Sequence, residues 1–136
     1  MRSVARLPVL LVIATALVAA CGGGGGSGAE GVGIGDENFV DLTGSDDVTV
    51  DALDNNFSPE YVEVAAGATV TFSNNGRNQH NVFPAEDGAF APIATSELGP
   101  GESASITFEE PGDYPYYCTL HGTPTKGMMG AIRVTG

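Results

Sequence analysis

Residues 48–136 alternate apolar and polar side chains in short runs, and this pattern is the strongest constraint on the fold. No part of this region repeats apolar residues at helical spacing over three turns, and glycine, proline and asparagine interrupt the runs. The pattern predicts strands at 48–53, 61–65, 69–73, 80–83, 103–108, 113–118 and 131–134. Many short strands at this spacing are typical of a Greek-key, two-sheet β-sandwich, so we expect one all-β domain over residues 48–136.

The first twenty residues have the composition of a secretory signal peptide. Arg2 and Arg6 form a positively charged start, and residues 7–20 are almost wholly apolar and end in small side chains before Cys21. The apolar stretch is short for a membrane span. We therefore expect residues 1–20 to be a signal peptide and the mature protein to leave the cytoplasm.

The tetrad Val18-Ala-Ala-Cys21 resembles the cleavage box of bacterial lipoproteins. The resemblance implies that Cys21 is lipidated and anchors an extracytoplasmic protein to the bacterial cell membrane; an ordinary signal peptide followed by an incidental cysteine is the alternative. Residues 21–47, rich in glycine and acidic side chains, are predicted to be the anchor and a flexible linker. Phe39, Val40 and Leu42 interrupt this polarity, and whether they dock on the domain is left open.

The charge of the chain excludes one large class of partners. Without Arg2 and Arg6, three basic residues remain against seventeen acidic ones, so the mature chain has a formal charge of −14. Nucleic-acid binding needs clustered lysine and arginine and is excluded, and anionic lipid headgroups would not attract the domain. We expect a soluble, acidic monomer whose contact with the membrane depends on Cys21.

Four side chains carry the chemistry of the domain. If Cys21 is lipidated, Cys118 is its only thiol, and His121 follows it by three residues; His80 is the only other histidine, and Met128 precedes the last predicted strand. Taken singly, each has an ordinary explanation: a histidine is usually on the surface or hydrogen-bonded, and a cysteine or methionine usually packs in the core. Together, two imidazoles, one thiolate and one thioether make the trigonal site with a weak axial ligand that blue copper uses for electron transfer.

Several segments in order resemble the cupredoxins, the family of plastocyanin, azurin and amicyanin. They are Phe57-Ser-Pro, Gly67-Ala-Thr-Val-Thr-Phe, His80-Asn-Val, Gly112-Asp-Tyr-Pro-Tyr-Tyr-Cys118-Thr-Leu-His121 and Gly127-Met128-Met-Gly130. The resemblance covers residues 57–136 and implies a cupredoxin-like sandwich with one type 1 copper ion. The loop 122–127 is longer than in plastocyanin-like members and departs from their pattern beside the expected axial ligand.

The resemblance also implies roles around the copper site. Asn81 is expected to tie the first-ligand strand to the ligand loop near Thr119, and Tyr117 resembles the tyrosine that lies at a partner surface in plastocyanin-like carriers. Met128 and Met129 both lie close enough in sequence to be the axial ligand. Met128 is favoured because it shares strand parity with Ile132, which is expected to face the core, although a β-bulge would invert this parity.

The predicted function is electron transfer between redox partner proteins, with no catalysis. A copper-binding or copper-delivery lipoprotein that holds only the cuprous ion is the alternative. A copper oxidoreductase would need imidazoles beyond His80 and His121, and a zinc hydrolase would leave Met128 without a role. The electron donor and acceptor cannot be predicted from the sequence.

Overall fold

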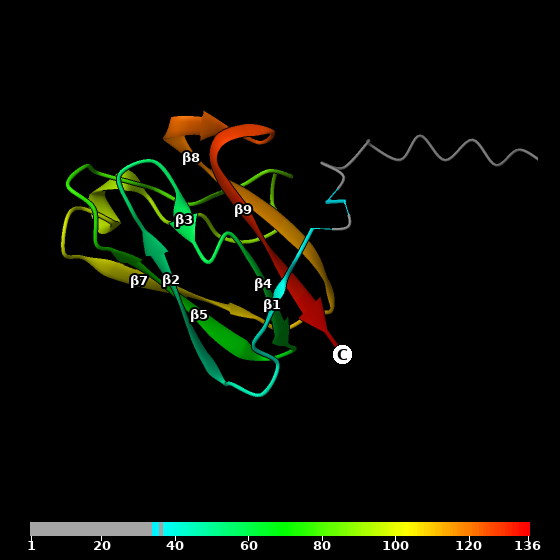
Figure 1. The fold of residues 1–136 in the computed structure, drawn as a ribbon. Coiled ribbons are helices and arrows are strands. Elements are labelled where there is room, and N and C mark those ends of the chain that lie inside the picture. The colour runs from blue at the N-terminus through cyan, green and yellow to red at the C-terminus, as the bar shows by residue number, and fades with distance from the viewer. Residues whose placement is uncertain (1–33, 36) are drawn as a thin grey trace, which may run out of the picture.

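A computed structural model describes residues 34–35 and 37–136, which form two β-sheets packed face to face (Figure 1). The strands are β1 (Val40–Asp41), β2 (Asp47–Ala52), β3 (Phe57–Ser58), β4 (Tyr61–Ala65), β5 (Ala68–Asn74), β6 (Phe83–Pro84), β7 (Ser103–Phe108), β8 (Gly112–Thr123) and β9 (Lys126–Thr135). One 3-10 turn, η1 (Thr95–Glu97), precedes β7. No helix in this part of the chain is long and apolar enough to cross a membrane.

The two sheets have the strand orders β1-β4-β9-β8-β6 and β3-β2-β5-β7. Both are mixed, because β2 pairs with β5, and β4 with β9, in parallel, whereas the long β8–β9 pair is antiparallel. Parallel neighbours cannot be joined by tight hairpins, so the chain passes repeatedly from one sheet to the other. The predicted all-β, two-sheet sandwich is confirmed.

The core lies between the sheets and follows from the alternation in the sequence. In β4, Val62 and Val64 are buried and their neighbours are half-buried, as expected for strands with one face toward the core. Phe57, Phe72 and Tyr116 pack edge to face at its centre, with ring centroids 4.9–6.0 Å apart. These rings join β3 and β5 of one sheet to β8 of the other.

The predicted strand at 80–83 is largely a loop. Only Phe83 belongs to a strand, while the His80 backbone N donates to Leu98 O over 3.1 Å. Val82 and Ile93 exchange two backbone hydrogen bonds, of 3.0 and 2.9 Å. His80, Asn81 and Val82 are all buried, and the backbone partner of this stretch is the segment 93–98 rather than a sheet, so the strand prediction was wrong at His80.

The segment at 39–42, which the sequence left open, docks on the sandwich. β1 pairs with β4 in parallel, and the Phe39 ring meets the Tyr61 ring edge to face at 5.6 Å. The Arg133 guanidinium lies 4.0 Å from the centre of the Phe39 ring, and Leu42 packs against the core. The end of the predicted linker is therefore part of the five-stranded sheet, next to β4. The predicted signal peptide and Cys21 lie outside the described residues.

Candidate metal centre

Three metal-binding side chains converge at one end of the sandwich. One ligand atom from each of His80, Cys118 and His121 lies within 4.8 Å of the others. Cys118 Sγ is 3.8 Å from His80 Nδ1 and 3.6 Å from His121 Nδ1. Donor atoms that share one ion through bonds of about 2.0–2.3 Å are separated by such distances. The cysteine sulfur and the two imidazole nitrogens are therefore placed to share a single metal ion.

Burial differs between the two imidazoles. His80 and Cys118 are fully buried, whereas His121 is half-buried. Burial lowers the pKa of His80, and the proximity of His121, whose ring centroid is 4.9 Å away, lowers it further. Since a metal binds the neutral imidazole, this environment favours the form that ligates. His80 Nε2 is buried and has no hydrogen-bond partner.

The long β8–β9 hairpin positions the other ligands. Cys118 and His121 lie on β8, where the pairing register shifts between Tyr117 and Gly122. Such an irregularity redirects side chains that strict alternation would send to opposite faces. It brings both Cys118 and His121 to the site although they are three residues apart.

Two glycines let the two hairpin strands approach closely beside the site. Gly127 has a φ of +78°, and a Cβ there would lie 2.6 Å from His121 O. A Cβ on Gly122 would lie 2.6 Å from the Met128 backbone N. Only glycine fits such contacts. The loop 122–127 therefore closes as a tight extension of the hairpin, and Met128, whose backbone lies beside Gly122, is fully buried on β9.

Asn81 joins the two ligand-bearing segments. Its Oδ1 accepts from Thr119 N over 2.8 Å, and its Nδ2 donates to Thr119 Oγ1 over 2.7 Å. Nδ2 also donates to Thr95 Oγ1 at 3.0 Å, which adds η1 to the network. The sequence suggested Asn81 and Thr119, but nothing in it pointed to Thr95, which is 14 residues from Asn81 along the chain.

The surface beside the site is partly apolar. Leu120, next to the half-buried His121, is 51% exposed. Tyr117 is half-buried and pairs with Phe83 of the edge strand β6, whereas Tyr116 is buried in the core. Tyr114 is half-buried and packs against the core. Met129 is half-buried, whereas Ala131 is buried and pairs with Tyr61 of β4.

Comparison with known proteins identifies one family. The family described as "Copper binding proteins, plastocyanin/azurin family" matches residues 45–135. Plastocyanin A'/A'' of Nicotiana tabacum is 37% identical over 102 residues, which are 68% of this chain and 96% of that protein. Chloroplastic plastocyanin of Physcomitrium patens is 42% identical over 86 residues, which are 58% of this chain but only 50% of the relative's length.

Solved structures show the same relationship. A reduced amicyanin carrying one substitution superposes with a TM-score of 0.57 and 28% identity, covering 67% of this chain and 84% of the amicyanin chain. A copper-containing nitrite reductase from Thermus scotoductus SA-01 superposes with a TM-score of 0.55 and 32% identity. That match covers 79% of this chain but only 26% of the reductase chain. The likeness to the reductase is therefore confined to one part of a larger protein.

Proposed function

Because the chain belongs to the plastocyanin/azurin family of copper-binding proteins, we propose that it is an electron carrier with a single type 1 copper ion. The observation that carries the proposal is the convergence of two imidazole nitrogens and one thiol sulfur at a mostly buried point. Met128 completes the proposed ligand set. When bound, copper supplies a one-electron couple between its cupric and cuprous states.

The residues of this chain would favour rapid electron exchange by limiting rearrangement. Thiolate and thioether stabilise the cuprous ion, while imidazole suits both oxidation states. Cys118 and His121 lie on one strand, and Asn81 links that strand to the loop of His80 through bonds of 2.7 and 2.8 Å. A site held in this way changes little between states. The half-buried His121 beside exposed Leu120 provides the proposed route to a partner.

Catalysis is not supported by the ligands available. The single site uses both histidines of the chain, so a further copper ion would lack imidazole ligands. Zinc could bind two histidines and a cysteine, but the buried Met128 would then have no function in the site. Copper delivery remains the competing proposal, because a carrier of the cuprous ion would use similarly soft ligands.

The absorption spectrum of the copper-loaded protein tests the proposal. We expect an intense visible band on oxidation, its reversible loss on reduction, and its absence in Cys118→Ala, which lacks the copper–thiolate bond. Ser105→Ala, on the exposed face of β7, is the matched control and should stay blue. A protein that binds only the cuprous ion and never turns blue would favour copper delivery, and a blue Cys118→Ala variant would contradict the site.

We further propose that the protein is extracytoplasmic and anchored to the bacterial membrane by lipid on Cys21. Support comes from the sequence alone, from the charged start, the apolar stretch and the small residues before Cys21. The wild-type protein should fractionate with membranes, and Cys21→Ser should release it. Finding the unmodified protein free outside the cell would contradict the anchor. Its redox partners would then be proteins at or beyond that membrane.

A further inference from the structure

β7 has the longest free strand edge in the described sandwich. The other three edge strands, β1, β3 and β6, have two residues each, and β6 contains Pro84. β7 has six residues, Ser103–Phe108, with no lysine, arginine or proline among them. Proteins normally block exposed edges with short strands, proline or charge, since an unprotected edge pairs readily with another chain. β7 has none of these protections.

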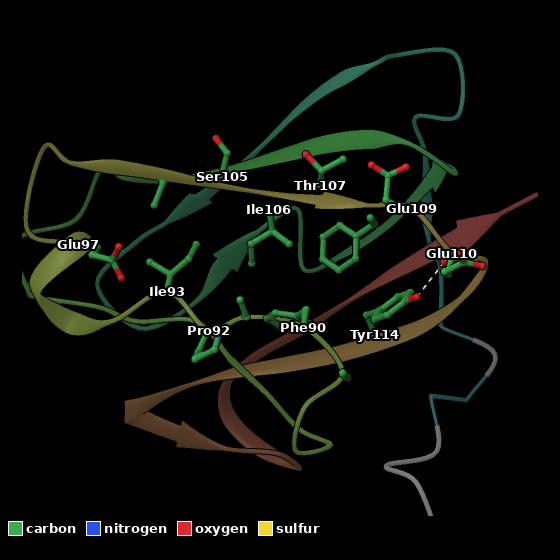
Figure 2. Close-up of a pocket in the computed structure, with 14 residues that line it drawn as sticks. Phe90, Pro92, Ile93, Glu97, Ser105, Ile106, Thr107, Glu109, Glu110 and Tyr114 are labelled. Carbon is green, nitrogen blue, oxygen red and sulfur yellow. Dashed lines mark hydrogen bonds between the residues drawn. The ribbon is translucent and has the colours of Figure 1, made fainter.

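An apolar groove of about 500 Å³ runs along this edge. Figure 2 shows Ile106 pointing into it from β7, with Phe90, Pro92 and Tyr114 on the opposite side. Phe90 meets the buried Phe108 edge to face, with ring centroids 5.6 Å apart. No backbone hydrogen bond joins β7 to residues 89–93 within the described part of the chain. The loop therefore flanks the edge without pairing with it.

The rim of the groove is acidic at both ends. Glu97 lies at one end, and Glu109 and Glu110 lie at the other (Figure 2). No lysine or arginine lines the groove. An apolar floor between carboxylates favours a ligand with an apolar middle and positively charged ends.

We propose that this groove binds an extended segment of a partner protein by strand addition to β7. The segment would form main-chain hydrogen bonds with β7 and place every second side chain, an apolar one, against Ile106 and Phe90. Lysine or arginine residues at its ends would meet the three glutamates. Six residues of β7 span about 20 Å, which sets the length of the segment. The proposal does not depend on copper.

A synthetic peptide provides the probe. In it, valine and threonine alternate over the length of β7, with paired lysines at both ends. Binding to the mature, copper-loaded protein is measured by fluorescence anisotropy, and the protected amides are identified by hydrogen exchange. We expect slower exchange in β7. Glu109→Lys/Glu110→Lys, which changes two exposed side chains, should weaken binding about tenfold.

A charge-matched variant serves as the control. Glu37→Lys/Glu60→Lys alters the net charge equally at exposed positions outside the groove, and should weaken binding less than about twofold. The proposal is overturned if the peptide does not bind, if both variants weaken binding equally, or if protection appears elsewhere.

Two other occupants of the groove are distinguished by the same exchange measurement without peptide. Protection of β7 that rises with protein concentration would mean that a second copy pairs there. Protection that disappears when residues 21–33 are removed would mean that the protein's own N-terminal segment does so. Either result would overturn the proposal of a partner segment.

Discussion

Both ends of the Asn81 side-chain amide are bonded to Thr119, one accepting from its backbone N–H at 2.8 Å and the other donating to its hydroxyl at 2.7 Å. The pair connects the loop of His80 to the strand of Cys118, although 38 residues separate them. Asn81 is 3% exposed, so water does not replace these bonds readily. Asn81 therefore ties the two ligand-bearing segments together beside the site, in addition to the pairing of Phe83 with Tyr117.

Replacing Asn81 should disturb both the fold and the copper site. Asn81→Leu leaves the Thr119 amide without its acceptor, and we expect a loss of about 2–3 kcal/mol in the free energy of unfolding, together with a shifted redox potential. Chemical denaturation and voltammetry measure the two effects. Thr95→Val, which removes only the 3.0 Å bond to η1, should have a smaller effect on both. Unchanged stability and potential in Asn81→Leu would refute the role of Asn81.

The two histidines should respond differently to replacement by alanine. Both variants lose an imidazole ligand and should bind copper more weakly. Added imidazole should restore the visible band in His121→Ala, because His121 is half-buried and its removal opens the site to solvent. His80 is fully buried, so His80→Ala should recover little. Titration with imidazole checks this; equal recovery would mean that solvent reaches both ligand positions.

The fold followed from the sequence where each strand has one buried face. The predicted strands at 61–65 and 103–108 agree with β4 and β7 to the residue, because apolar and polar side chains alternate cleanly there. His80 was assigned to a strand because the residue types of a short apolar run do not reveal whether its backbone partner is a sheet or a loop. β1 and β3, with two residues each, are too short to produce a pattern.

The site was more predictable than its surroundings. Cysteine, histidine and methionine are scarce in the chain, so their spacing indicated the ligand set before any geometry was known. The contact of Thr95 with Asn81 depends on tertiary structure and has no local signal. The same is true of the acidic groove, which has Glu97 at one end and Glu109 and Glu110 at the other.

The buried hydroxyl of Tyr116 should reduce stability. Its oxygen has no hydrogen-bond partner, and the side chain is 1% exposed. Tyr116→Phe keeps the ring packing with Phe57 and Phe72 and removes the unsatisfied group, so the free energy of unfolding should rise by about 1 kcal/mol. Tyr114→Phe is the control, because it removes a 2.8 Å bond to Glu110 O and should instead lower stability slightly. A destabilised Tyr116→Phe variant would indicate an additional partner for the hydroxyl.

Alkaline pH should increase the difference in stability between Tyr116→Phe and the wild type. Burial raises the pKa of Tyr116 far above its ordinary value of 10.0. Above pH 10 the unfolded chain releases this proton while the folded chain retains it, so the unfolded state binds fewer protons and stability falls as pH rises. The stability linked to the proton of Tyr116 is complete below pH 10 and is lost as the pH rises above it. Thermal melts from pH 8 to 11 should show a smaller decline for Tyr116→Phe than for the wild type, and parallel declines would contradict this linkage.

The axial ligand is expected to be Met128 rather than Met129. Gly130 faces the core, because a Cβ there would lie 2.6 Å from Tyr116 Oη. Side chains alternate along a strand, so Met128, two residues before Gly130, faces inward too. Burial agrees: Met128 is fully buried, whereas Met129 is half-buried beside Ile34 and Pro124. The register shift of the hairpin lies on the β8 side, between Tyr117 and Gly122.

Paired substitutions of the two methionines test this assignment. The axial ligand tunes the potential of a blue-copper site, and the amide oxygen of glutamine stabilises the cuprous ion less than a thioether does. Met128→Gln should therefore lower the potential and alter the visible spectrum, whereas Met129→Gln should leave both nearly unchanged. Voltammetry of the two variants under identical conditions gives the comparison. A larger shift in Met129→Gln would place the axial ligand one residue later, which would require Met129 to turn inward from its half-buried position.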